Sequence, residues 1–274
     1  VGDRPGVGDR PGVGDRPGVG DRPGVGDRPG VGDRPLVGTR PERIENRQQL
    51  QDHRQQRRQQ VREQFRDNHP RWDFWTDHPT WARWRLNRPY RWATWAALTS
   101  WFPWGWNDPT YYDYGTDVYY QDDSVYYGDQ VIAPVDQYAD QAQAIATGAA
   151  EMPADTQPSD WMGLGVFAIT KDGEASGPPP TLILQLQVNR DGLITGTLQN
   201  TATDQVQQIE GAVDKQSQRS AWTVADKSWP VMETGISNLT KDETAALVHF
   251  EDGQTQQWLL VRVEDPEGSS APTP

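Results

Sequence analysis

The chain has no cysteine, which removes disulfides, thiolate catalysis and Cys-ligated metal sites from consideration. The absence does not identify a compartment, because many exported bacterial proteins also lack cysteine. Long apolar runs are missing as well. No stretch of about 18 uncharged apolar residues is present, so the sequence predicts no transmembrane span. Apolar residues make up only 34% of the 274 positions, and the first 42 residues contain too few of them to build a core.

Catalytic signatures are also absent. The sequence contains no nucleophile elbow, phosphate-binding loop, zinc-protease helix, EF-hand or dinucleotide fingerprint. We therefore expect a non-enzymatic protein without a cofactor. The four histidines show no recognised ligand spacing, so no metal site is predicted. Acidic residues between the aromatic segments are compatible either with Ca²⁺ binding or with solvated turns: Asp108, Asp113, Asp117, Asp122, Asp123 and Asp129.

Charge is distributed unevenly along the chain. The formal net charge is −13, which argues against a nucleic-acid partner. Residues 37–107 carry thirteen Arg against seven acids, whereas residues 108–160 carry eleven acids and no Lys or Arg. Because opposite fields attract, these neighbouring blocks are expected to bind one another first.

The first 42 residues form a low-complexity repeat. VGDRPG occurs five times, followed by VGDRPL and a decayed VGTRPE. One Val per hexamer cannot bury enough surface to offset backbone ordering, so residues 1–42 are predicted to be a disordered tether. The chain begins with Val1 in mid-repeat and without Met, so we expect a fragment or processed form whose signal peptide lies upstream.

Residues 43–68 predict a polar, basic helix. They contain no Gly or Pro and are rich in Gln, Arg and Glu. Leu50, Val61 and Phe65 fall near one face, with Arg54 and Arg57 between them, so the apolar stripe is thin. The pattern favours a solvated helix leaning on the next segment. A basic helix docked on an anionic surface is the alternative.

Tryptophan is the most concentrated feature of the chain. Nine of the thirteen tryptophans lie between residues 72 and 106, mostly as WxxW pairs. His69-Pro70 and His78-Pro79 introduce two copies of a short repeat, and Pro residues suit a first helical turn. We expect helical turns there, the longest from about Pro89 to Phe102. The nine indoles are candidate ligand-stacking residues: Trp72, Trp75, Trp81, Trp84, Trp92, Trp95, Trp101, Trp104 and Trp106. The competing interpretation is a small aromatic core.

The Trp-rich segment continues into a Tyr-rich one, and residues 69–148 are predicted to form one helical-plus-hairpin module. VYY recurs at Val118 and Val125, which indicates two or three short strands within residues 108–133. Asp136 to Thr147 predicts a helix that ends at Gly148. Residues 149–159 contain two prolines and are predicted to be a linker.

Residues 160–263 are predicted to be an antiparallel all-β domain, and residues 264–274 a disordered tail. Strand periodicity and turn signals place eight segments at 163–171, 182–188, 193–200, 205–213, 218–225, 230–237, 244–251 and 254–263. Seven to eight strands at this spacing favour a barrel or a sandwich. The overall class is therefore mixed. A barrel is also compatible with a small-ligand carrier, unless its interior is filled by Leu182, Leu184, Leu186, Ile194, Trp222 and Val261.

Five stretches together carry a family resemblance: the VGDRPG array, RPYRWATWAALTSWFPWGW, DVYYQDDSVYYGDQ, QNTATDQVQQIEGAVDKQSQRSAWTV and HFEDGQTQQWLLVR. They resemble uncharacterised bacterial cell-surface proteins labelled mu-protocadherin. The resemblance implies an exported protein at the cell surface or in the periplasm. Cadherin calcium runs such as DxNDN are absent, so neither a cadherin fold nor calcium sites are expected. The expected role is structural or adhesive, with an envelope polysaccharide or another surface protein as partner. A glycan-binding aromatic module is a further alternative.

Overall fold

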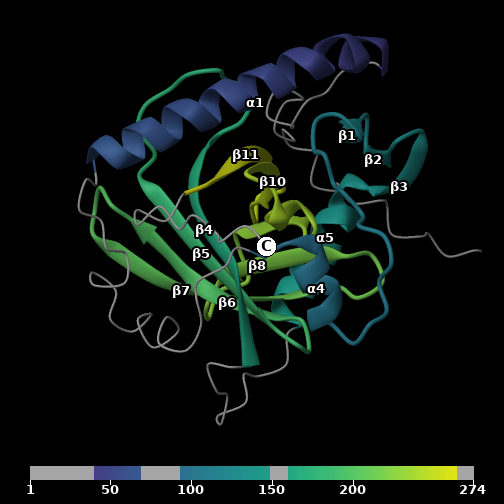
Figure 1. The fold of residues 1–274 in the computed structure, drawn as a ribbon. Coiled ribbons are helices and arrows are strands. Elements are labelled where there is room, and N and C mark those ends of the chain that lie inside the picture. Colours follow the sequence, from purple (N-terminus) through teal and green to yellow (C-terminus); the bar gives the residue numbers. More distant parts are fainter. Residues whose placement is uncertain (1–39, 69–92, 149–159, 264–274) are drawn as a thin grey trace, which may run out of the picture. The chain divides into compact units, whose positions relative to one another are not determined.

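The computed structural model describes residues 40–68, 93–148 and 160–263 of the chain (Figure 1). The predicted linker 149–159, the predicted tail and almost all of the repeat segment lie outside these residues. So do both His-Pro repeats of the Trp-rich segment.

An eight-stranded antiparallel barrel is the centre of the described fold. Its strands are β4 (Trp161–Lys171), β5 (Leu182–Asn189), β6 (Leu193–Asn200), β7 (Gln205–Val213), β8 (Arg219–Val224), β9 (Val231–Gly235), β10 (Glu243–His249) and β11 (Thr255–Arg262). Each strand pairs with the next one along the chain, and β11 pairs with β4 to close the barrel. This confirms the predicted antiparallel barrel, and strands β6 and β7 have the predicted bounds.

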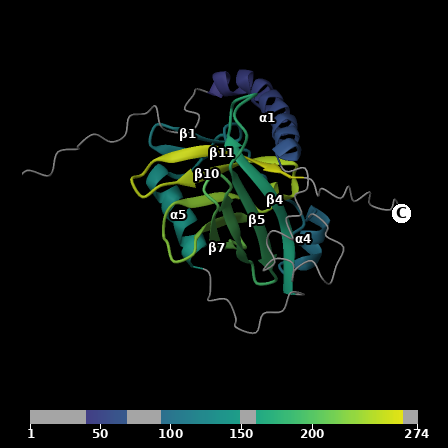
Figure 2. The same ribbon diagram turned by 90° about the vertical axis from the view of Figure 1, so that its left-hand side faces the viewer.

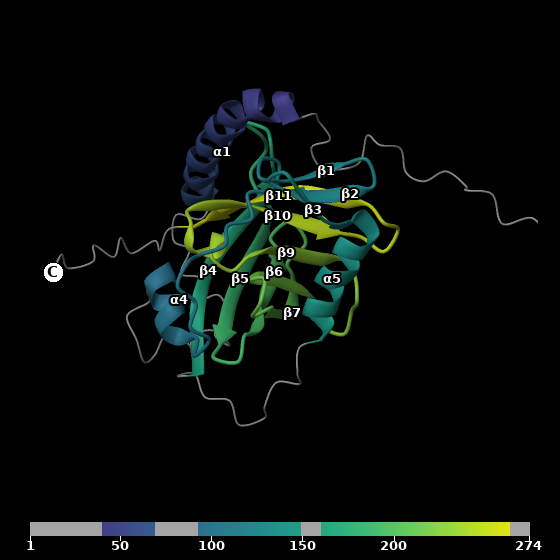
Figure 3. The ribbon, with the colours of Figure 1, turned by 90° about the vertical axis from the view of Figure 1, so that its right-hand side faces the viewer.

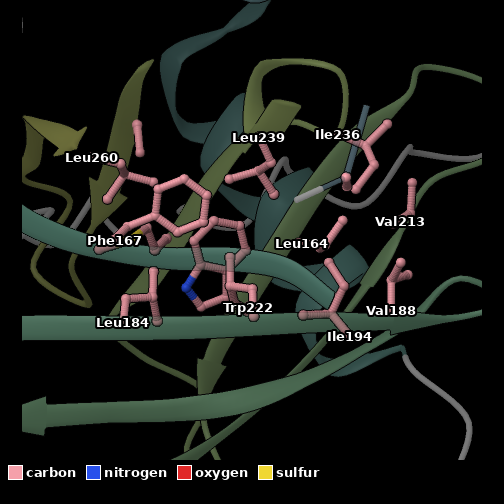
Figure 4. Packing of buried hydrophobic residues seen from close by; sticks show 14 of the residues in the cluster. Leu164, Phe167, Leu184, Val188, Ile194, Val213, Trp222, Ile236, Leu239 and Leu260 are labelled. Carbon is pink, nitrogen blue, oxygen red and sulfur yellow. The ribbon is translucent and has the colours of Figure 1, made fainter. Parts of the chain in front are cut away.

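The barrel interior is filled with apolar side chains. In β5, alternate residues Leu184, Leu186 and Val188 belong to the interior cluster, as the period of two requires. Figure 4 shows Phe167 and Trp222 side by side among neighbouring aliphatic side chains of this cluster. Four residues predicted to fill the barrel, Leu184, Leu186, Ile194 and Trp222, lie in this cluster, and Leu182 packs against it.

Val261, named from the sequence among the side chains that could fill the barrel, lies outside it. Val261 belongs to an outer cluster, whereas its neighbour Leu260 belongs to the interior one. The two faces of a strand alternate, and β11 pairs Val261 with Ala168, which is also on the outer face. Leu259, Leu260 and Val261 are all apolar, so the period of two does not show which of them points into the barrel.

A long helix, α1 (Arg40–Asn68), lies against β10 and β11 (Figure 1). Val61 and Phe65 join the outer cluster beneath it, and Arg54 and Arg57 are buried as well. The expectation of a solvated helix is therefore wrong. The two arginines complete the contact face, because acceptors on the barrel satisfy their guanidinium groups.

A three-stranded sheet and another helix cover other outer faces of the barrel. The sheet contains β1 (Val118–Gln121), β2 (Ser124–Tyr127) and β3 (Gln130–Pro134), and the helix is α5 (Val135–Thr147). Tyrosines of this layer share a cluster with Ala245 and Leu247 of β10, and α5 alanines pack on Ala221 of β8. Figures 2 and 3 show α5 on a different side of the barrel from the short helix α4 (Trp95–Trp101).

Candidate functional site

Four of the nine candidate indoles lie within the described residues. They are Trp95, Trp101, Trp104 and Trp106, whereas Trp72, Trp75, Trp81, Trp84 and Trp92 lie outside the described ranges. Trp101 is buried, with 5% of its surface exposed, and the other three are half-buried. All four pack against the interior cluster of the barrel. Residues 93–106 and the barrel therefore share one core, in contrast to the β domain separate from the aromatic module that was expected from the sequence.

Local sequence explains how α4 positions these rings. Thr94 caps the helix, with its Oγ1 accepting a hydrogen bond from the Ala97 amide at 3.2 Å. The helix ends at Trp101, and Pro103 and Gly105 follow, where Gly105 has φ +70°. Leu98 and Trp101, three residues apart, then point to the same face and are both buried. The helix ends within one residue of the end predicted at Phe102, while the predicted start at Pro89 lies outside the described residues.

The rings form one continuous aromatic cluster. Phe102 and Trp104 are stacked with centroids 4.2 Å apart, and Trp104 meets Trp106 edge-on at 4.8 Å. Trp106 is also parallel to Trp95, at 6.0 Å between centroids. Such offset and edge-to-face pairs are favourable beyond the area that they bury. We call Trp95, Phe102, Trp104 and Trp106 the aromatic cluster.

The aromatic cluster and the neighbouring Trp101 are held against the barrel end at which strands β5, β7 and β9 finish, which we call the cap end. Arg190, in the β5–β6 turn, stacks its guanidinium over Trp101 at 4.4 Å and donates from Nη1 to the Trp101 carbonyl at 3.1 Å. Trp106 Nε1 donates to the Lys215 carbonyl in the β7–β8 turn at 3.0 Å. These contacts fix two indoles to two different turns of the barrel.

Gly192 makes room for the aromatic cluster. Its φ of +88° is one that L side chains rarely adopt, and a Cβ at this position would lie 2.5 Å from an edge carbon of Trp104. The turn predicted between the segments 182–188 and 193–200 is therefore also the surface on which an indole rests. Sequence reasoning gave the turn but not this contact, because Trp104 is 88 residues away in the chain.

Hydrogen bonds also attach the residues that follow the indoles to the cap end of the barrel. The Thr110 amide donates to Gln218 Oε1 at 2.8 Å, and the Tyr112 amide donates to Asn238 Oδ1 at 2.9 Å. Tyr112 also donates its hydroxyl to the Ser217 carbonyl at 2.7 Å. Gln218, Ser217 and Asn238 lie in the β7–β8 and β9–β10 connections. Sequence reasoning missed all three, since polar loop residues give no sign of a distant backbone partner. Residues 93–112 thus cap one end of the barrel.

A second cluster, buried and polar, was also missed. Glu233 Oε2 accepts from Arg219 Nη2 at 2.5 Å, and His249 Nε2 lies 2.9 Å from Glu233 Oε1. The other ring nitrogen, His249 Nδ1, lies 3.0 Å from Thr255 Oγ1. The spacing of hydroxyl, imidazole and carboxylate has the geometry of an activated nucleophile. All four side chains are nevertheless buried, with no residue more than 4% exposed, so substrate has no access in this conformation.

Burial and charge set the protonation of this network. Burial alone would raise the pKa of Glu233, but Arg219 and His249 outweigh it and hold that pKa below its ordinary value. Burial raises the pKa of Tyr114 and of Tyr138 well above the ordinary value of 10, so both phenols stay neutral. Tyr138 also lies under the Arg219 guanidinium, 3.8 Å from it. The network is a compact ion pair that fixes the α5 layer to β8 and β9.

The described residues contain neither a metal-binding group of acids and histidines nor a membrane-spanning helix. No group of three or more His, Asp or Glu suited to a metal ion occurs within 40–68, 93–148 and 160–263. Two of the candidate Ca²⁺ acids are paired with cations instead, Asp113 with Lys241 and Asp117 with Arg47. In the described helices, no stretch is both long and apolar enough to cross a bilayer.

Comparison with known proteins gives no assignment. No family model, curated protein or solved structure matches the chain.

Proposed function

We propose that this protein is a non-enzymatic envelope protein with a structural or adhesive role. The observation that carries the proposal is the aromatic cluster at the cap end. Trp95, Trp104 and Trp106 keep part of their surface exposed, although each ring is packed and one indole N–H is fixed by a carbonyl. Immobilised, half-buried indoles are suited to stacking on the flat faces of sugar rings. The VGDRPG array and the resemblance to cell-surface proteins support the location.

A ligand carrier and an enzyme receive less support from the fold. The side chains that fill the barrel occupy the space that a carried ligand would need. The Thr255–His249–Glu233 arrangement has suitable spacing for catalysis, but it is sealed beneath the outer layer. Adhesion through the aromatic cluster requires neither a cavity inside the barrel nor displacement of the outer layer that covers Thr255, His249 and Glu233, which is why we favour it.

Titration of tryptophan fluorescence with purified envelope polysaccharides tests the proposal. We expect a spectral shift and saturable binding that Trp106→Ala weakens at least tenfold. The matched control is Trp258→Ala, which removes a half-buried indole at the opposite end of the barrel, where β11 begins. Equal affinity in both variants, or unchanged emission with every polysaccharide, would contradict adhesion through this cluster.

A further inference from the structure

The contact between α1 and the barrel is made mainly by arginine. Among residues 47–68, the part of this helix whose side chains are described, the buried apolar residues are Leu50, Val61 and Phe65. By contrast, Arg54, Arg57, Arg58 and Arg62 all reach groups on the barrel or its β4–β5 loop. The interface therefore depends strongly on charge and hydrogen bonding.

One ion pair anchors the centre of the interface. Arg54 Nε and Nη2 hold the two oxygens of Asp172 at 2.9 and 2.6 Å, and the Asp172 side chain is 1% exposed. Arg54 Nη2 also donates to the Tyr114 carbonyl at 2.7 Å. Removing one member of such a buried pair leaves the other charge without compensation, so the interface should be sensitive to a single change here.

Outer pairs continue along the helix toward its C-terminal end. Arg58 Nη1 lies 2.5 Å from Glu243 Oε2, and Arg62 Nη2 lies 3.4 Å from Asp242 Oδ1. These side chains are partly exposed, so dissolved salt screens their attraction.

The barrel does not require α1 for its own connections. Every barrel strand pairs with two other barrel strands, and the interior cluster contains no residue of α1. Detachment of the helix would expose the outer cluster, including Val166, Ile183 and Val261, while leaving the strand pairing and the interior intact.

We propose that α1 is a releasable strap. The whole helix detaches from the barrel as one unit, and the barrel stays folded. The helix is released when the contacts of its arginines with the barrel are weakened. Release uncovers an apolar strip on β4, β5 and β11, which is bordered by Asp172, Asp242 and Glu243. The strap is independent of whatever the aromatic cluster binds, because no cluster residue contributes to the outer cluster beneath α1.

The absence of cysteine makes a direct test available. Val261→Cys places a single thiol under α1, and Val248→Cys places one in the barrel interior on the adjacent strand. Both are measured in the full chain by the rate of labelling with a thiol-reactive dye. Ala168→Cys and Ala246→Cys form a second pair of reporters for the same two places, should either valine variant misfold.

Arg54→Gln is the perturbation, and Arg66→Gln is its matched control, since Arg66 is exposed and its Nε donates within α1 to the Arg62 carbonyl. We expect Arg54→Gln and added salt each to raise labelling under the helix at least tenfold. Labelling in the interior and in the Arg66→Gln background should stay unchanged. Equal labelling rates for the two reporters in every background would overturn the strap, because release would then require unfolding of the barrel. An unchanged rate under α1 in Arg54→Gln would overturn it too.

Discussion

Truncation of Trp101 is the sharpest perturbation of the shared core. The indole is buried against the interior cluster, and Arg190 stacks on its outer face. Replacing a buried Trp by Ala costs about 3–5 kcal/mol, because the lost transfer energy is added to the energy of the cavity left behind. For a cooperative unit of this size each kcal/mol lowers Tm by about 2–4 °C, so Trp101→Ala should lower Tm by roughly 6–20 °C.

The assay is thermal unfolding followed by far-UV circular dichroism, which reports on the barrel strands. Because residues 93–112 and the barrel share a core, the whole transition should move and remain single. The matched control is Trp95→Ala on the same helix, where the half-buried indole loses about 1–2 kcal/mol of burial and gives a smaller shift. A barrel transition that stays in place in Trp101→Ala, with loss of only a separate early step, would refute the shared core.

Three further predictions concern the contacts around the barrel. Gly192→Ala should lower the free energy of unfolding by about 1–3 kcal/mol more than Gly173→Ala, since both have positive φ but only Gly192 has a neighbour where the Cβ would stand; chemical denaturation of the two variants measures the difference. Burial raises the pKa of Tyr112 to about 12, so its contribution to stability is complete below pH 10 and is lost as pH rises through 12, which ultraviolet absorbance of tyrosinate during alkaline unfolding will detect. Glu233→Gln should destabilise the fold by about 3–5 kcal/mol, because it leaves Arg219 buried without its carboxylate. In the unaltered protein the pKa of Glu233 is lowered, so the contribution of this carboxylate to stability is complete above pH 4.5 and is lost as pH falls further. Acid titrations of both proteins should show the difference.

Local patterning was enough to predict the strands. Alternation at Leu182–Val188 and the Gly-containing turn after it predicted the start of β6, because a period of two and a turn signal are both encoded within a few residues. The predicted bounds of β7 agree as well. The α5 helix, predicted from Asp136, begins one residue earlier at Val135. Closure into a barrel, as opposed to a sandwich, depended on β11 pairing with β4, and sequence spacing does not encode that contact.

The hydrogen-bond partners of the buried polar side chains could not be predicted from the local sequence. Arg54 and Arg57 looked like interruptions of an apolar stripe, because their acceptors Asp172 and Gly177 lie more than a hundred residues further along the chain. The same holds for Glu233 and His249, which periodicity placed on strands without indicating that they face each other. For the indoles, burial of Trp101 supports the core interpretation, while the half-open rings of Trp104 and Trp106 remain compatible with ligand stacking.

Native-state amide hydrogen exchange tests most directly whether the cap belongs to the barrel. The Leu98 and Phe102 amides are hydrogen-bonded within α4, and the Tyr112 amide is bonded to Asn238. If residues 93–112 and the barrel form one cooperative unit, these three amides should exchange with the same opening free energy as the interior strand residue Leu186. Exchange of the cap amides at a clearly lower free energy, with Leu186 still protected, would contradict the account.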